Sequence, residues 1–371
     1  MIPSISPSKT SLEHDNDMTL YNLMPSLEKY TKSSPHSFLV NTMDTKLPKS
    51  CLLANCIKTR PHIAKRLLLL IKAAFSKQKN NSCDLLSSLV KQKSGSIEKC
   101  YGTFIDARRS GSGGMVRITC NNEKKYAVKT FRECQKDEPR HKYLQWINNE
   151  ITIALKLKHP YIVQTYEVLK EDGKIHSVME YCPYDLYHLV EEGKVTQELA
   201  AKYFVQLVHA INYIHSCGIA HRDIKLENIC VDEDGSMKLI DYGCAFVFRA
   251  SPQHESRAAS TMCGSLAYIA PELHTCDSYD PCKSDIWSIA VVYLTMILRS
   301  FPWSTAMHFD HGYKMFLKYR NNSHYFNRIP ESAIPVIRKM LDPNPDTRAS
   351  IQDVLSDPWV KSIALDFNTI L

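Results

Sequence analysis

A stretch of eight residues, 221–228, concentrates groups that could carry out chemistry. Within it, Asp223 is an acid that could accept a proton from a hydroxyl group, and Lys225 is a cation that could hold a phosphate. Asn228 offers an amide oxygen that could bind a metal ion, and Asp241, further along, supplies a carboxylate suited to the same purpose. The sequence therefore gathers a proton acceptor, a phosphate-binding cation and two oxygen ligands for a metal.

Two runs resemble the catalytic and metal-binding loops of protein kinases: His221-Arg222-Asp223-Ile224-Lys225-Leu226-Glu227-Asn228 and Asp241-Tyr242-Gly243. The resemblance implies that Asp223 orients the attacking hydroxyl and accepts its proton, while Lys225 neutralises charge on the transferring γ-phosphoryl group. Asn228 and Asp241 would hold Mg²⁺, or Mn²⁺ as an alternative, and ATP would be the phosphate donor. Tyr242 replaces the usual phenylalanine, and its hydroxyl needs a partner if the ring is buried.

The elements that position these groups follow from the same resemblance. It implies an α+β chain with the bilobal protein kinase fold, in which a small β-rich N-lobe carries one regulatory helix and the large C-lobe is mainly α-helical. We expect the kinase domain over residues 98–362, with the N-lobe at 98–182 and the C-lobe at 183–362. A tail at 1–97 would precede the domain, and a short C-terminal tail at 363–371 would follow it.

A glycine-rich turn between two expected strands could bring backbone amides close to phosphate oxygens. Such a turn alone is a weak signal, because many hairpins use glycines. Compared with the kinase pattern, Gly111 and Gly114 match its second and third glycines, and Gly113 lies between them. Val116 matches the apolar residue that covers the adenine, whereas Arg109 stands in place of the first glycine.

An apolar strand ends in Lys129, which the resemblance assigns to the α- and β-phosphates, with Ala127 in the adenine pocket. A buried lysine needs a counter-charge. Apolar residues at helical spacing predict a helix over Leu144–Leu157, and Glu150 lies off its apolar stripe. Either Glu150 is an exposed helix residue, or it pairs with Lys129 as in kinases, and we favour the pair.

The connection between the lobes would follow a strand at Ile175–Glu180. By the resemblance, Met179 limits the depth of the adenine pocket. Backbone groups of Glu180 and Cys182 would form hydrogen bonds with the base.

The loop between Gly243 and the run Ala270-Pro271-Glu272 contains hydroxyl side chains and few apolar residues. Kinases with an arginine at the position of Arg222 commonly order this loop by binding a phosphate on it. We therefore expect an upstream kinase to phosphorylate one of three candidates, Ser256, Ser260 and Thr261. The alternative is a loop that is ordered without phosphate.

Other residues match positions that contact or brace the catalytic loop in protein kinases. Ser265 is of the type that touches the catalytic aspartate in serine/threonine kinases, so it predicts Ser/Thr specificity. Glu272 and Arg348 match a buried ion pair with a structural role, and Asp285 is expected to brace the catalytic loop. The helix that begins near Asp285 is almost wholly apolar and should form the centre of the C-lobe.

The tail carries the whole basic excess of the chain, with 14 lysines and arginines against 6 acidic residues in 1–97. Its Ser-rich, aperiodic sequence predicts a largely disordered regulatory segment. One island, Lys65–Phe75, is apolar with basic flanks and could contact an anionic membrane surface or a partner groove. Alternatively, it packs on the kinase domain as a short helix or forms no structure. The tail lacks the interleaved aromatics expected of a nucleic-acid-binding segment.

The thirteen cysteines show no zinc-like or disulfide-like spacing, which favours reduced thiols in a cytoplasmic protein. We expect no membrane span and no secretory signal, a monomeric chain, and a location in the cytoplasm that could extend to the plasma-membrane periphery.

Within the kinases, several runs look like the fungal halotolerance and nitrogen-permease-reactivator group: Met179-Glu180-Tyr181-Cys182-Pro183, Lys238-Leu239-Ile240-Asp241, Gly264–Glu272 and Phe301-Pro302-Trp303. The resemblance implies signalling that controls ion or nutrient transport. Glu227 could meet a basic residue of the substrate, but Thr295 replaces a second glutamate of arginine-directed kinases. A catalytically weak pseudokinase scaffold is the alternative function.

Overall fold

The computed structural model describes residues 96–367, apart from 112, 252 and 323–325. The predicted tail, including the basic island Lys65–Phe75, lies outside the described residues except at its end. A short helix, α4 (Ile97–Tyr101), begins there, and Ile97 is buried against the sheet of the N-lobe.

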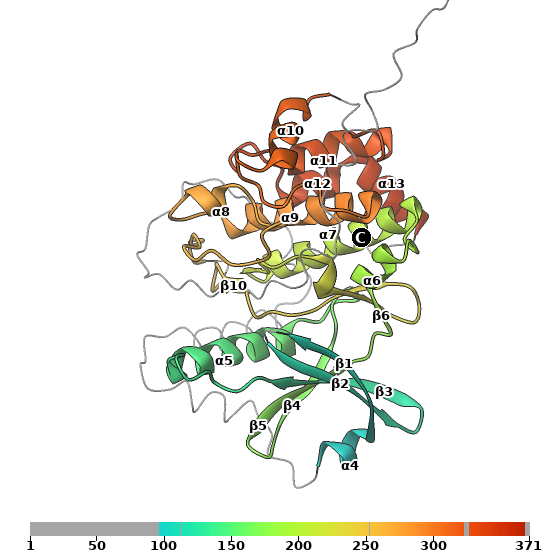
Figure 1. Ribbon diagram of the computed structural model, residues 1–371, viewed down its shortest axis with the longest axis vertical. Coiled ribbons are helices and arrows are strands. Elements are labelled where there is room, and N and C mark those ends of the chain that lie inside the picture. Colours follow the sequence, from blue (N-terminus) through green and yellow to red (C-terminus); the bar gives the residue numbers. More distant parts are fainter. Residues whose placement is uncertain (1–95, 112, 252, 323–325, 368–371) are drawn as a thin grey trace, which may run out of the picture.

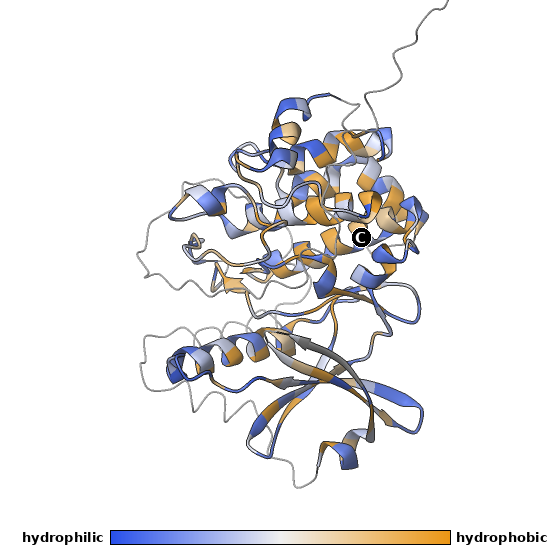
Figure 2. Ribbon diagram, viewed as in Figure 1, coloured by the Kyte–Doolittle hydropathy of each residue, from blue (hydrophilic) through white to orange (hydrophobic). Residues whose placement is uncertain are grey.

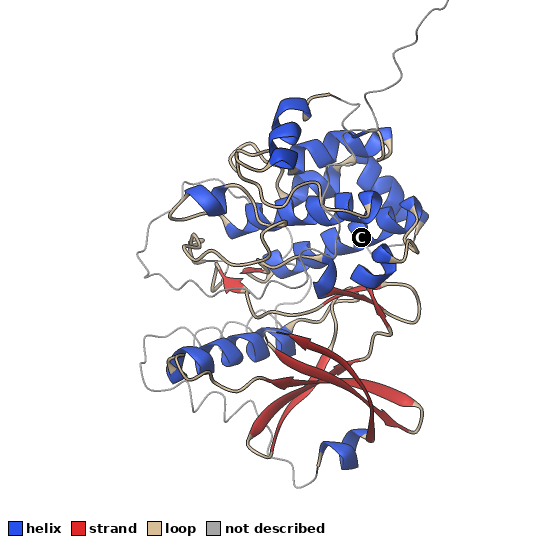
Figure 3. Cartoon of the chain, viewed as in Figure 1, coloured by secondary structure: helices blue, strands red, loops and turns tan. Residues whose placement is uncertain are grey.

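The N-lobe is built on one antiparallel sheet with the strand order β1-β2-β3-β5-β4 (Figure 3). Its strands are β1 (Thr103–Gly111), β2 (Gly114–Asn121), β3 (Lys124–Phe131), β4 (Thr165–Glu171) and β5 (Lys174–Glu180). Asn122 and Glu123 both have positive φ between β2 and β3, as do Asp172 and Gly173 between β4 and β5. Two consecutive residues of this kind form the tight turns that match the twist of a hairpin.

One long helix, α5 (Arg140–Lys156), lies alongside this sheet (Figure 1). Ile147 and Ile151 are fully buried and pack with Phe131 of β3 and Val168 of β4. Because residues three and four apart share a helix face, this packing also turns Glu150 toward the sheet, where its side chain is buried.

The C-lobe is mainly helical (Figure 3). Its α-helices are α6 (Leu186–Glu191), α7 (Gln197–Ser216), α8 (Glu272–Thr275), α9 (Pro281–Leu298), α10 (His311–Tyr319), α11 (Ile334–Met340), α12 (Ile351–Ser356) and α13 (Pro358–Asp366). Short strands lie near the N-lobe: β6 (Tyr184–Asp185), β7 (Ile219–Ala220), β8 (Ile229–Val231), β9 (Met237–Leu239) and β10 (Phe246–Val247). The 3₁₀ turns η2 (Leu226–Asn228) and η4 (Glu331–Ala333) complete the described elements.

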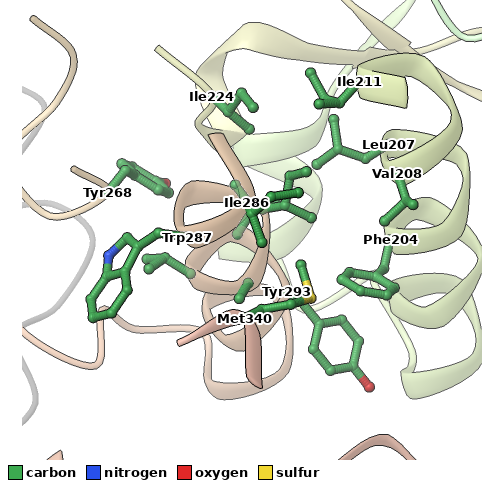
Figure 4. Packing of buried hydrophobic residues seen from close by; sticks show 14 of the residues in the cluster. Phe204, Leu207, Val208, Ile211, Ile224, Tyr268, Ile286, Trp287, Tyr293 and Met340 are labelled. Atoms are coloured by element: carbon green, nitrogen blue, oxygen red, sulfur yellow. The ribbon is translucent and has the colours of Figure 1, made fainter. Parts of the chain in front are cut away.

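Helices α7 and α9 form the core of the C-lobe, and apolar residues concentrate there (Figure 2). Phe204 and Leu207 of α7 face Ile286 and Tyr293 of α9 across this core (Figure 4). The prediction that the apolar helix after Asp285 forms the centre of the lobe is therefore confirmed. Burial of the apolar surface between these helices makes the main favourable contribution to the stability of the C-lobe.

Helix α9 departs from one sequence expectation. Its 18 residues are long and apolar enough to cross a membrane by length and composition, whereas we expected no such segment. In the folded chain 78% of that stretch is buried inside the protein. Its apolar character thus serves the core of the C-lobe.

The α+β bilobal fold predicted from the sequence is confirmed. The small sheet-based lobe and the large helical lobe meet along the side that carries α5, β6 and β10 (Figure 1).

Candidate active site

Lys129 on β3 lies at the centre of a cluster of charges, in which Lys129 and Glu150 are buried and the Asp241 side chain is 37% exposed. Its Nζ forms an ion pair with Glu150 of α5 and lies 3.5 Å from Asp241 Oδ1. The strand places Lys129 there because it is paired with Val116 on one side and Ser177 on the other, in the middle of the sheet. The favoured interpretation of Glu150 as a partner of Lys129, over an exposed helix residue, agrees with this geometry.

The pKa values of the cluster reflect burial among opposite charges. Burial alone would lower the pKa of Lys129, but Asp241 and Glu150 raise it above its usual value. Burial raises the pKa of Glu150 to about 7, although Lys129 opposes the shift. Burial would also raise the pKa of Asp241, but Lys129 and the Gly243 N–H hold it below its usual range. Lys129 therefore stays cationic and Asp241 anionic at neutral pH.

Asp223, Lys225 and Ser265 form a closed triangle of polar contacts. Lys225 Nζ lies 2.8 Å from Asp223 Oδ2 and donates to Ser265 Oγ at 2.9 Å. Ser265 Oγ in turn donates to Asp223 Oδ1 at 3.2 Å. Residues 40 positions apart in the sequence thus hold the carboxylate of Asp223 in one orientation.

Asn228 and Asp241 offer oxygen ligands beside this triangle. The Asn228 amide nitrogen donates to the backbone oxygen of Asp223 at 2.8 Å and to Oδ2 at 3.1 Å. This leaves its amide oxygen for a metal ion. Asp241 has a positive φ of 66°, and the Gly243 N–H donates to its Oδ1 at 3.1 Å. Mg²⁺ needs only one or two such protein ligands beside nucleotide phosphates, so this donor set fits it.

The glycine-rich turn lies close to Lys129 and leaves little room for side chains at Gly113 and Gly114. A Cβ atom on Gly113 would lie 3.1 Å from Lys129 Nζ. Gly114 has a φ of +139°, and a Cβ there would lie 2.0 Å from the Thr130 carbonyl oxygen. Gly111 ends β1, whose backbone pairs Arg109 with Val116. A backbone turn of this kind above a lysine suits the phosphates of a nucleotide.

The predicted adenine-binding residues lie on adjacent strands and the segment that follows them. Ala127 of β3 is directly opposite Met179 of β5. The Glu180 side chain pairs with Lys238 on β9 at 2.8 Å, a link between the lobes that the sequence did not reveal. Burial raises the pKa of the Cys182 thiol, so it remains neutral.

Asp285 of α9 braces the start of the catalytic loop, as its position in the sequence suggested. Its fully buried carboxylate accepts hydrogen bonds from the backbone N–H groups of His221 at 2.9 Å and Arg222 at 2.8 Å. The ring of His215 lies 2.8 Å from the same carboxylate. These bonds hold Arg222 at a φ of 65°, a left-handed conformation that is costly for a residue with a side chain.

Arg222 contacts only one of the three predicted phosphorylation candidates among the described residues. Its Nη1 donates to Thr261 Oγ1 at 3.1 Å and to the Thr261 carbonyl oxygen at 3.3 Å. Ser256 and Ser260 are exposed, and no bond joins them to Arg222 in the described part of the chain. Tyr279, which sequence reasoning missed, lies at the same place, 3.3 Å from Arg222 Nη1.

Glu272 and Arg348 form a two-pronged ion pair beneath the loop, with distances of 2.7 and 2.8 Å. Their side chains are 4% and 0% exposed. Arg348 also donates to the Lys283 carbonyl oxygen at 2.8 Å. The pair connects the end of the loop between Gly243 and Glu272 to the helical core of the C-lobe.

Tyr242 is buried, and its ring lies against that of His221, with centroids 5.6 Å apart. The hydroxyl that we expected to need a partner has none among the described residues. Burial raises the pKa of this phenol, so it stays protonated.

Comparison with known proteins places this geometry in a family. Residues 110–360 match the family described as "Protein kinase domain". The "Nitrogen permease reactivator protein" of Saccharomyces cerevisiae is 32% identical over 300 residues, covering 68% of this chain and 38% of that protein. "Serine/threonine-protein kinase hal4" of Schizosaccharomyces pombe is 32% identical over 284 residues, covering 72% and 44%.

A further similar protein, "Probable serine/threonine-protein kinase RTK1" of Saccharomyces cerevisiae, is 35% identical over 284 residues, covering 72% of this chain and 45% of that protein. The chain thus spans half or less of the length of these curated relatives. The resemblance to the fungal group predicted from the sequence is confirmed, and membership of the family implies ATP and Mg²⁺ as cofactors and proteins as substrates. By its fold, its site geometry and the match over 110–360, the chain belongs to the protein kinase family.

Proposed function

We propose that the protein is a serine/threonine kinase that transfers the γ-phosphoryl group of MgATP to hydroxyl groups of protein substrates. The main support for this proposal is the arrangement of the charged residues in the site. Lys129 is paired with Glu150 beside Asp241, and Asp223 is held by Lys225 and Ser265. A pseudokinase scaffold would not need these charges to be positioned together.

In the proposed mechanism, the residues of the chain position reactants and balance charge. Asp223 orients the acceptor hydroxyl and takes its proton, and Lys225 faces the charge that develops on the transferred group. Lys129 holds the α- and β-phosphates, while Asn228 and Asp241 bind Mg²⁺, which supplies charge neutralisation when bound.

The preference for serine and threonine rests on Ser265, which touches both Asp223 and Lys225. We expect no strong preference for basic substrates. Thr295, which replaces the second glutamate of arginine-directed kinases, is fully buried and donates to the Val291 carbonyl oxygen at 2.8 Å. It cannot contact a substrate peptide.

The proposed cellular role is signalling that controls ion or nutrient transport. The support is similarity to relatives, one of which is named for reactivating a nitrogen permease. Replacing Met179, which faces Ala127 across the sheet, by glycine should open the adenine pocket to a bulky inhibitor. Phosphoproteome comparison before and after adding the inhibitor should show loss of phosphate from transporter-associated proteins. If none of them changed, this role would be wrong.

We also propose that the protein works as a monomer in the cytoplasm and reaches the plasma-membrane periphery through its basic tail. The surplus of lysine and arginine in 1–97 supports attraction to an anionic surface. Sedimentation with vesicles that contain phosphatidylserine should require this tail. Equal sedimentation of the chain without residues 1–97 would contradict the proposal.

Phosphorylation of Thr261 is expected to activate the enzyme. A phosphate there would meet Arg222, whose Nη1 already bonds to the Thr261 hydroxyl, and would strengthen that contact by charge. Replacing Thr261 by alanine should therefore lower the activity of the protein isolated from cells by about tenfold. Replacing Ser256 or Ser260, which are exposed, should change it by less than about twofold. Unchanged activity in the triple alanine variant would show that the loop is ordered without phosphate.

A further inference from the structure

Trp146 on α5 occupies a place that the kinase motifs do not explain. It lies about one helical turn before Glu150, so both side chains extend from the same face of the helix. The other tryptophans of the chain, Trp287, Trp303 and Trp359, are buried in the C-lobe. Trp146 is therefore the one tryptophan of the chain beside the charge cluster.

One side of the indole is fixed by the N-lobe. Its ring meets that of Phe131 edge to face, with centroids 6.1 Å apart, and the Arg132 guanidinium lies 4.9 Å from its ring centroid. Tyr143, one turn earlier on α5, lies at 6.1 Å. Contacts of this kind hold an aromatic ring in one orientation.

The nitrogen-bearing edge of the ring faces two glycines from different parts of the site. A Cβ atom on Gly243, next to the metal-binding aspartate, would lie 3.2 Å from Trp146 Nε1. A Cβ atom on Gly113, in the glycine-rich turn, would lie 3.8 Å from Cζ2. Because Nε1 and Cζ2 belong to the same edge, one side chain lies between the glycine-rich turn and the turn that carries Asp241, and it leaves little room for a Cβ atom at Gly243 unless the ring moves.

A second contact ties the same helix to the Asp241 turn. Asn149 donates from Nδ2 to the Ala245 carbonyl oxygen at 3.1 Å. Trp146, Asn149 and Glu150 thus lie against the metal-binding turn, and Trp146 also lies near the glycine-rich turn.

We propose that Trp146 is a positioning residue for phosphoryl transfer, whose indole sets the separation between the glycine-rich turn at Gly113 and the Asp241 turn. Its width would therefore set how closely the glycine-rich turn approaches Lys129 and Asp241, which lie 3.5 Å apart. Small displacements of such groups have large effects on rate. The proposal rests on the proposed kinase function.

Intrinsic fluorescence tests the placement without any turnover. Titration of the full chain with MgADP should change the tryptophan emission, and the change should vanish in Trp146→Phe, which leaves the three buried C-lobe tryptophans. Binding of MgADP is measured separately by its effect on melting temperature. If MgADP raised the melting temperature of the wild type without changing its emission, Trp146 would not lie at the nucleotide and the proposal would be overturned.

Steady-state kinetics test the positioning role. Trp146→Phe keeps a ring against Phe131 but lacks the edge that faces the glycines, so kcat should fall about tenfold with a rise in KM for ATP. The matched control is Gln145→Ala, which alters an exposed residue of the same helix and should stay within about twofold. A Trp146→Phe enzyme with a lower melting temperature but unchanged kcat and KM would reveal a merely structural residue. If the wild type itself transferred no phosphate, the proposed kinase function would be wrong, which is a different outcome from an unchanged Trp146→Phe enzyme.

Discussion

Replacing Asp241 by asparagine is expected to lower kcat/KM by about 10³-fold or more. The substitution removes the negative charge that lies 3.5 Å from Lys129 and is the proposed ligand of Mg²⁺. Loss of metal-based charge stabilisation is worth several kcal/mol in the transition state, and each 1.36 kcal/mol is about tenfold in rate. Transfer of labelled phosphate from ATP to a protein substrate measures the effect.

The control for this experiment is Asp353→Asn, which removes the carboxylate of the capping box of α12 in the C-lobe. That variant should lose some stability but keep its rate constants within about twofold. Substantial activity of the Asp241 variant at saturating Mg²⁺ would show that this carboxylate is not the metal ligand.

Breaking the Glu272–Arg348 pair is expected to give the largest loss of stability. Removing one partner from a buried pair leaves an uncompensated charge and typically costs about 3–5 kcal/mol. Arg348→Met would leave Glu272 buried without its partner, since the two side chains are 0% and 4% exposed. The midpoint of urea unfolding should therefore fall clearly.

Two further variants make this result interpretable. Arg320→Met breaks a pair with Asp342 that is partly exposed, at 21% and 23%, and should cost no more than about 1 kcal/mol. Adding Glu272→Leu to Arg348→Met should recover part of the lost stability, because no charge is then left unpaired. Equal losses for Arg348→Met and Arg320→Met would contradict the structural role of the buried pair.

Much of the fold follows from local patterns, and the exceptions have physical reasons. The apolar spacing that predicted a helix at Leu144–Leu157 identified the buried part of α5, which begins earlier at Arg140. Its first turn is exposed and polar, so it leaves no apolar signal. Helix α4, which ends at Tyr101 just before β1 begins at Thr103, was not predicted, because a helix of five residues is too short for periodicity to reveal.

The residues of the site also differ in how well the sequence could predict them. Groups within one motif, such as Asp223 and Lys225, could be named from spacing and chemistry alone. The choice of Thr261 over two similar hydroxyls could not, since it depends on where Arg222 lies in the folded loop. Trp146 was missed for the same reason, because its significance comes from glycines distant in the sequence.

We expect the assembled site to transfer phosphate to serine and threonine. The most direct test compares the wild type with Asp223→Asn in a transfer assay with labelled ATP, followed by identification of the phosphorylated amino acids. We predict phosphoserine and phosphothreonine from the wild type, and a rate lower by about 10²-fold or more for the variant, which lacks the proton acceptor. Equal transfer by both proteins, or phosphotyrosine as the product, would contradict the account.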